Sequence, residues 1–252
     1  MHIVEYSVLS YYPSFILTDS MTIGLLFHCV HDDQREFVHT SNWNRLKSFD
    51  DELNLEFVKA FLKDISNSIE PNLLNTKPFN LKEFTKFYVN EYKFSKVHRV
   101  EVGSAAEFIE TSKKIYLKYD YKISDRTSKR EELNYLKTLL QSSSMSYKRD
   151  GVEGSYDDKV SYDYIINNNI GIKLFTFTES SIHHYVNQAK IWAFNAAEMA
   201  NHYKTVITYI IAEEFDYQDN QHFKSIIGIL KDSKVEKVQP FDEFLKSLNK
   251  IE

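Results

Sequence analysis

The sequence predicts a mixed α+β fold in two subdomains, and three observations support this prediction. Runs of β-branched and aromatic residues alternate with segments whose apolar residues recur at helical spacing. The 252 residues are enough for two small domains. A polar segment, DYKISDRTS at 120–128, separates two sets of elements. We therefore expect an N-terminal domain over 1–122, a small sheet covered by helices, and a C-terminal domain over 123–252, a mixed sheet flanked by helices.

The first half is expected to begin with strands at 3–9, 22–30 and 35–40, which are rich in β-branched and aromatic residues. From Asp50 onward, apolar residues recur every four positions, which predicts a helix that Asp50 caps and Pro71 ends. The apolar residues of this helix are Leu53, Phe57, Phe61, Ile65 and Ile69. The later elements expected here are a helix over 80–90 capped by Asn80, a strand over 96–104, and a helix from the Ser104 cap to about Tyr119.

In the second half, Ser128 and Glu131 form the capping-box pattern of a new helix. The polar stretch 142–158 is predicted to be an exposed loop. The next segment, YDYIINNNIGIKLFTFT at 162–178, is predicted to be a tight hairpin. A long helix then lies between two strands, which implies partly parallel pairing. The last elements expected are a helix over 181–203, a strand over 205–211, a helix around 223–230, a short strand near 234–238 and a helix near 241–249.

The composition is that of an ordinary globular protein, with 42% hydrophobic and 27% charged residues, which excludes a disordered chain. Six Gly and four Pro, with abundant Lys, Asn, Ile and Tyr, are typical of an AT-rich bacterial or phage genome. The net charge of −5 does not demand the basic face of a nucleic-acid binder and favours a protein partner.

The single cysteine, Cys29, excludes an intrachain disulfide and fits a reducing compartment. The first residues, MHIVEYSVLSYYPSF, have neither a basic region nor a long apolar run, so no signal peptide is expected. No stretch of about 18 apolar residues is present, so we also expect no transmembrane helix and no membrane partner. These observations together predict a cytoplasmic protein.

The N-terminal half resembles an uncharacterised bacterial family, domain of unknown function 3037. The resemblance lies in YSVLSYYPSFILTDSMTIGLLF, with its Tyr-Ser start, its Tyr-x-Pro turn and the Ile23-Gly24 step in a hydrophobic strand. The helix at 51–70 and the segment VEVGSAAEFIETSKKIYLKY fall where that family has its later helix and tail. The resemblance covers roughly residues 1–120 and implies a fold but no reaction.

The C-terminal half resembles the core of the restriction-endonuclease-like superfamily, which runs helix, meander, helix, strand. The resemblance implies an acid on one strand and an acid-x-lysine on the next, which hold Mg²⁺ and position the attacking water. If Asn167–Asn169 form a three-residue loop, Asp163 lies directly opposite Lys173 on the same face. The resemblance therefore makes Asp163 and Lys173 the candidate catalytic pair.

The position of the second carboxylate in that pattern is taken by Gly171. Asp163 alone supplies a single carboxylate, which is too few protein ligands for a Mg²⁺ site, so a displaced acid would have to complete it. The upstream Asp157 and Asp158 are candidate metal ligands with Asp163. On the preceding helix, Glu131 and Glu132 stand where some members of the superfamily carry another metal-linked acid. An ordinary cross-strand ion pair between Asp163 and Lys173 is the alternative interpretation.

Two further groups of residues combine side chains that can bind a partner or a metal ion. Tyr147, Lys148, Arg149 and Tyr156 lie in the polar stretch before the hairpin and are candidate partner contacts, because they combine aromatic and basic side chains in an exposed segment. In HCVHDD, consecutive residues of a strand point to opposite faces, so His28 and Cys29 do not suit one metal site. A buried cysteine and exposed histidines are the expected arrangement.

Three functions follow from these patterns. The first is a non-catalytic protein-interaction module on a degenerate nuclease-like scaffold, without a cofactor, encoded by a phage or mobile element and acting on a host defence or replication complex. The second is a Mg²⁺-dependent nuclease with a displaced metal ligand. The third is a nucleic-acid-binding protein without catalysis. The first is preferred because Gly171 replaces the second acid.

Overall fold

The computed structural model describes residues 1–14, 19–71, 78–149, 151–177, 182–211 and 221–248. The fold is mixed α+β, as predicted. The chain divides into two compact units, Met1–Thr127 and Ser128–Glu252. The division falls inside the polar segment 120–128, five residues after the expected boundary.

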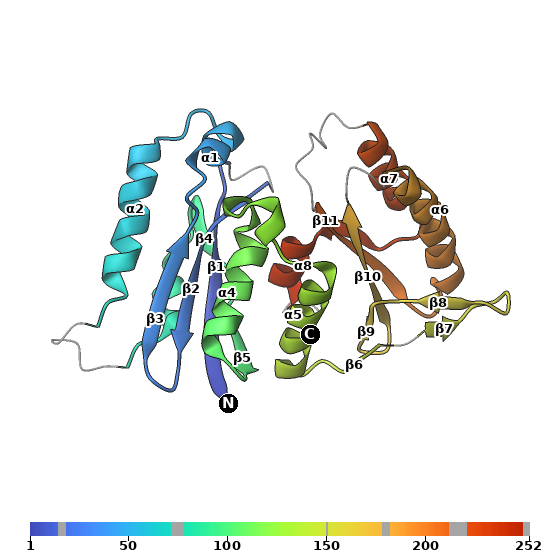
Figure 1. Cartoon of the computed structure of the whole chain (residues 1–252), viewed down its shortest axis with the longest axis horizontal. Coiled ribbons are helices and arrows are strands. Elements are labelled where there is room, and N and C mark those ends of the chain that lie inside the picture. Colours follow the sequence, from blue (N-terminus) through green and yellow to red (C-terminus); the bar gives the residue numbers. More distant parts are fainter. Residues whose placement is uncertain (15–18, 72–77, 150, 178–181, 212–220, 249–252) are drawn as a thin grey trace. The chain divides into compact units, whose positions relative to one another are not determined.

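The first unit is built on an antiparallel sheet in the order β3-β2-β1, and two short strands share the other edge of β1 (Figure 1). The long strand β1 pairs with β5 through His2–Tyr6 and with β4 through Leu9–Tyr11. The strands expected near the N-terminus and before Ser104 are confirmed, whereas β4 was not predicted. The strands are β1 (His2–Tyr11), β2 (Met21–Cys29), β3 (Gln34–His39), β4 (Tyr92–Phe94) and β5 (His98–Val102).

Helices cover both faces of this sheet. On one face, α4 (Ala105–Tyr116) places Phe108 and Tyr116 against the buried ring of Tyr6. On the other face, α1 (Trp43–Phe49) and α2 (Leu55–Ser68) pack on Leu9 and Ile23, with the short α3 (Leu81–Thr85) nearby. The alternation of side chains along β1 and β2 thus supplies two separate apolar cores.

The helix predicted from Asp50 begins four residues later. Asp50 is the C-cap of α1, and the side chain of Asn54 caps α2 by accepting bonds from the amides of Glu56 and Phe57. The expected stripe is also wrong at Phe57, which is exposed. A spacing of four residues advances about 40° per step around a helix, so such a stripe cannot stay on one face. The buried residues of α2 are Val58, Leu62 and Ile65.

The other predicted caps of this unit are confirmed. The side chain of Asn80 accepts a bond from the amide of Glu83, and that of Ser104 accepts one from Glu107. Both helices are shorter than expected, since α3 ends at Thr85 and α4 at Tyr116. Two 3-10 turns follow α4, η1 (Lys118–Asp120) and η2 (Ile123–Asp125).

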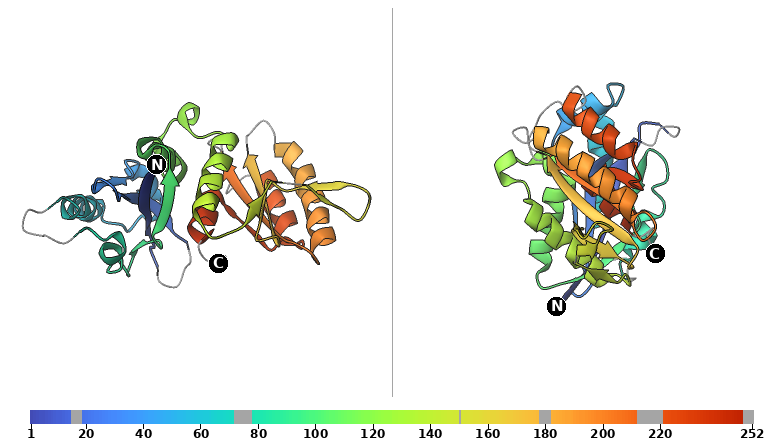
Figure 2. Two further views of the ribbon diagram at one scale, coloured as in Figure 1. Left: turned by 90° about the horizontal axis from the view of Figure 1, so that it is seen from below. Right: turned by 90° about the vertical axis from the view of Figure 1, so that its right-hand side faces the viewer.

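The second unit has a mixed sheet in the order β12-β11-β10-β9-β6, with helices on both faces. Figures 1 and 2 show α5 and α8 on one face and α6 and α7 on the other. The pairs β10–β11 and β11–β12 are parallel, as the intervening helices predicted, while β9 and β6 add antiparallel edges. The strands are β6 (Tyr147–Lys148), β9 (Tyr164–Ile166), β10 (Ile170–Phe177), β11 (Lys204–Ile211) and β12 (Lys237–Pro240).

The helices of this unit are α5 (Lys129–Ser142), α6 (Ile182–Met199), α7 (Gln221–Lys231) and α8 (Phe241–Ser247). Ser128 and Glu131 form the predicted capping box of α5. In α6 the side chains of Ala189, Trp192 and Ala196 are buried, and they pack with α7 on β10 and β11. This α6–α7 layer is the main core of the unit.

The stretch predicted as a loop, 142–158, contains two short strands and is otherwise irregular over the residues that the structure describes. After α5 come β6, then a separate hairpin of β7 (Gly151–Glu153) and β8 (Lys159–Ser161). Glycines and charges suggested a loop, but strand pairing with β9 and within the hairpin satisfies the backbone. The polar side chains of 153, 157 and 159 remain exposed, as expected for an edge hairpin.

Candidate functional site

The predicted pair of Asp163 and Lys173 meets at the end of β9. The loop 167–169 joins Ile166 to Ile170 as predicted, and the register brings Asp163 opposite Lys173. Asp163 Oδ2 lies 3.6 Å from Lys173 Nζ, and the same oxygen accepts a bond of 2.8 Å from the amide of Leu174. The carboxylate is thus already held by an amide of β10 and an ammonium group.

A second lysine joins this pair from the first turn of α5. Lys129 Nζ lies 4.0 Å from Asp163 Oδ2 and donates a bond of 2.6 Å to the carbonyl of Leu174. Burial lowers the pKa of Lys129, and the charges of Asp163 and Glu132 act in the opposite direction. Glu132, one of the predicted acids, is only 3% exposed. Asp163, Lys129 and Lys173 therefore form one cluster, and the buried Glu132 acts on the charge of Lys129 from nearby.

The position of the missing second acid is filled by an aromatic ring. A Cβ atom built on Gly171 would lie 2.3 Å from Cε1 of Tyr162, far inside van der Waals contact. The Tyr162 ring is buried, packs 5.3 Å from Trp192 between centroids, and its hydroxyl lies 2.8 Å from the Thr205 hydroxyl. Gly171 is consequently the residue that the close approach of Tyr162 requires.

The other predicted acids have separate structural roles. Glu131 accepts bonds of 2.7 Å from the amide and hydroxyl of Ser128. Asp157 lies in the tip of the β7–β8 hairpin at a φ of 57°, and the carbonyl of Asp158 accepts a bond from Gly154. Among the described residues, no group of three or more His, Cys, Asp or Glu side chains is placed to hold a metal ion.

The electrostatics of the cluster oppose binding of a divalent cation at Asp163. A metal ion bound to Oδ2 would be repelled by the ammonium groups of Lys129 and Lys173, whose Nζ atoms lie 4.0 Å and 3.6 Å from that oxygen. Lys173 also donates a bond of 3.2 Å to the carbonyl of Ser161 and lies over the Trp192 ring. The arrangement suits a structural polar cap better than a metal centre.

The side chains of Asp163 and Lys129 bind backbone groups of β10 beyond Ile172, where the pairing with β9 stops. Only Ile170–Ile172 pair with β9, so the next backbone groups on this side need other partners. Asp163 binds the amide of Leu174, Lys129 binds its carbonyl, and the hydroxyl of Tyr185 donates to the carbonyl of Thr176. Three side chains thus replace a neighbouring strand.

The predicted partner contacts divide between two places. Tyr147 and Arg149 both lie against the ring of Tyr164, with the Arg149 guanidinium 5.3 Å from its centroid. Lys148 is exposed on the edge strand β6. Tyr156 is at the tip of the β7–β8 hairpin, where it contacts a different residue, Phe194.

The contact between Tyr156 and Phe194 belongs to an exposed apolar patch. Tyr156 is 70% exposed, and on α6 Phe194 is 54% and Ile191 49% exposed. The tip is fixed to α6 because the amide of Ser155 donates to the Glu198 carboxylate. The sequence predicted Tyr156 but missed Phe194 and Ile191, although both are large apolar residues off the buried stripe of α6. We call these three residues the hairpin–α6 patch.

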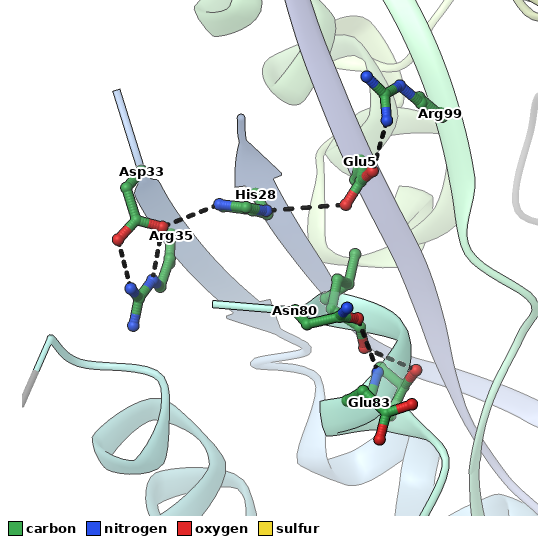
Figure 3. A network of polar contacts seen from close by, with 9 residues as sticks. Glu5, His28, Asp33, Arg35, Asn80, Glu83 and Arg99 are labelled. Carbon is green, nitrogen blue, oxygen red and sulfur yellow. Dashed lines mark hydrogen bonds and ion pairs between the residues drawn. The ribbon is translucent and has the colours of Figure 1, made fainter. Parts of the chain in front are cut away.

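The first unit contains a row of charges across four strands (Figure 3). Arg99 binds Glu5 at 3.3 Å, Glu5 lies 3.7 Å from His28, His28 binds Asp33 at 2.9 Å, and Asp33 pairs with Arg35. Strand register makes Arg99, Glu5, His28 and Arg35 successive cross-strand neighbours. His28 is therefore buried rather than exposed as expected, because charged neighbours supply its partners.

Comparisons with known proteins found no matching family model, no matching curated protein and no matching solved structure. No helix within the described ranges is long and apolar enough to span a membrane.

Proposed function

We propose that this chain is a non-catalytic protein-interaction module that uses a degenerate nuclease-like scaffold. The observation that carries the proposal is the ring of Tyr162 over Gly171, which leaves no room for the second carboxylate of a nuclease centre. The remaining acid, Asp163, supports the same proposal because it is occupied by the Leu174 amide and two lysines.

The surface proposed for the partner is the hairpin–α6 patch. Exposed apolar side chains that touch one another are typical of protein–protein contact sites, and aromatic residues are the usual anchors. The tip is held by the bond from Ser155 to Glu198, so Tyr156 is presented in a defined position. The composition and mild acidity support a phage or mobile-element setting, with a host defence or replication complex as the target.

One observation favours the alternative of a Mg²⁺-dependent nuclease. Glu132 is buried beside Lys129, close enough to influence its pKa, and Lys129 in turn lies beside Asp163. In that alternative Glu132 is the displaced ligand, and Lys173 orients the attacking water.

The first test separates catalysis from its absence. Wild type, Asp163→Ala and Glu132→Gln are incubated with plasmid and single-stranded DNA in Mg²⁺ or Mn²⁺, and metal binding is followed by calorimetry. The proposal expects no cleavage and no binding that depends on Asp163. Metal-dependent cleavage by wild type that both variants lose would establish the nuclease alternative.

The second test addresses the patch. A Tyr156→Ser/Phe194→Ser double variant is compared with wild type as bait in bacterial lysate, and Phe87→Ser, at a 75% exposed position of the first unit, is the matched control. We expect proteins retained by wild type and by the control to be lost from the double variant. Equal retention by all three baits would remove the patch from the proposal.

A further inference from the structure

The carboxyl ends of two parallel strands lie beside the first turns of two helices. Strand β10 ends at Phe177 and β11 at Ile211, and the helices that follow them, α6 and α7, begin at Ile182 and Gln221. Both helices pack on the same core, and Figure 1 shows them side by side. Open sheets with parallel strands commonly bind ligands at this end, because the connections after the strands converge there.

Two histidines meet at this place from separate helices. His183 lies in the first turn of α6 and His222 in the first turn of α7. Their ring centroids are 4.5 Å apart and the rings are inclined by 77°. Both residues are exposed, so the rings are open to solvent and to a solute.

This separation fits two imidazoles on one metal ion. With metal–nitrogen bonds of about 2.05 Å, and about 1.15 Å from a ring nitrogen to its centroid, each centroid stands about 3.2 Å from the metal. Two centroids 4.5 Å apart then subtend about 90° at the metal, the angle between neighbouring ligands of Ni²⁺ or Cu²⁺. A tetrahedral angle requires a separation of about 5.2 Å, which a shift of about 0.7 Å provides for Zn²⁺.

We propose that His183 and His222 form a binding site for a divalent transition metal of the nickel, copper and zinc group, with water in the remaining coordination positions. Imidazole ligands favour these ions over Mg²⁺, which prefers oxygen. The site has two protein ligands and is independent of Asp163 and of the proposed function. A bound ion would join the first turns of α6 and α7, which are distant in sequence.

Calorimetry on the full chain, without a polyhistidine tag, tests the site. NiCl₂, CuCl₂, ZnCl₂ and MgCl₂ are titrated into wild type, His183→Ala, His222→Ala and the matched control His184→Ala, which removes the neighbouring exposed histidine. We expect one equivalent of Ni²⁺, Cu²⁺ or Zn²⁺ to bind wild type and His184→Ala, and Mg²⁺ not to bind. Because two ligands on fixed helices act as linked binding groups, either single variant should weaken binding by about 100-fold.

Two further readouts follow the same proteins. Saturating Zn²⁺ should raise the melting temperature of wild type by about 5 °C, since only the folded chain brings the two rings together, and should not raise that of either ligand variant. Electron paramagnetic resonance of the Cu²⁺ complex should show two coordinated nitrogens in wild type and one in His222→Ala. Circular dichroism checks that the surface variants are folded.

The proposal is overturned if wild type shows no saturable binding below 1 mM metal, on the order of the weakest specific affinities. It is equally overturned if His222→Ala binds as tightly as wild type, or if His184→Ala loses binding to the same extent as the two ligand variants.

Discussion

Adding one methyl group at Gly171 should destabilise the second unit, because the Tyr162 ring occupies the space of a Cβ atom. In the structure this Cβ would meet Cε1, Cδ1 and Cζ of the ring at 2.3–2.5 Å. The φ angle of Gly171 is not positive, so alanine is compatible with the backbone and only the ring opposes it. The Gly171→Ala variant therefore isolates the contact that excludes an acid from this position.

The size of the expected destabilisation follows from the contacts that the Tyr162 ring would lose by moving. Overpacking a filled core costs about 1–3 kcal/mol. Displacement of Tyr162 would also break the bond between its hydroxyl and Thr205, which contributes about 1 kcal/mol. We expect Gly171→Ala to lower the free energy of unfolding by about 2–4 kcal/mol, and Gly171→Asp to lower it by more because it adds a buried charge.

Urea denaturation followed by tryptophan fluorescence measures this effect. Trp192 lies 5.3 Å from the Tyr162 ring between centroids, so its emission should also change in the folded variant. A Trp43→Phe background removes the other tryptophan, which lies in the first unit. Gly228→Ala is the matched control, since a Cβ there meets nothing within 4 Å and alanine should stabilise helix α7 by up to about 1 kcal/mol.

The reasoning is refuted if Gly171→Ala is as stable as wild type with unchanged Trp192 emission. A double-mutant cycle adds a second check. In a Tyr162→Ala background, Gly171→Ala should cost less than about 0.5 kcal/mol, because the opposing ring is absent. A cost that persists without the ring would mean that something other than Tyr162 excludes a side chain from Gly171.

Two further predictions concern single side chains. Burial lowers the pKa of His98 to about 4, from an ordinary value of 6.5. Below pH 6.5 the imidazole of His98 therefore binds a proton in the unfolded chain but not in the folded chain. The free energy of unfolding is unaffected at pH 7 and falls by about 3 kcal/mol toward pH 4. Urea titrations should show a smaller fall for His98→Leu, and an equal fall would contradict the burial argument. Asp163→Ala leaves the Leu174 amide without its acceptor and should cost about 1–3 kcal/mol, more than Lys173→Met at below about 1 kcal/mol. The reverse order in denaturation would show that the ion pair, and not the amide bond, matters.

The local patterns of the sequence predicted much of the fold correctly. Ser128 with Glu131 specified the start of α5, and three asparagines between apolar runs specified the hairpin loop at 167–169. The loop length then set the register that places Asp163 against Lys173. Signals of this kind depend on neighbours in the sequence, which is why they could be recognised without a structure.

Other features depend on competition between local signals or on distant neighbours. Asp50 and Asn54 are both good cap residues, and the separate helix α1 ends where the expected one was to begin. The short strands β4 and β6 exist because β1 and β9 offer them free edges. Neither edge is encoded in the short segments themselves.

The candidate site also combines features that the local sequence predicts with features that depend on distant residues. The sequence shows that Gly171 stands where the second acid is expected. The reason for the glycine is the ring of Tyr162, which lies nine positions away and meets Gly171 only after the hairpin has formed. Likewise, the contact between His183 and His222 joins residues that are 39 positions apart through the packing of α6 on α7. Periodicity could place each residue on its helix and could not bring the two together.

The three side chains that replace a strand along β10 have a consequence for the state of the protein at high concentration. An exposed strand edge is a template on which another chain can add, and sheets that grow in this way lead to aggregates. A chain that added beside Leu174 and Thr176 would first have to displace a carboxylate, an ammonium group and a phenol from the backbone groups that it needs. This edge is therefore protected from strand addition by the side chains of Asp163, Lys129 and Tyr185. Aggregation by strand addition would have to start at another edge of the sheet.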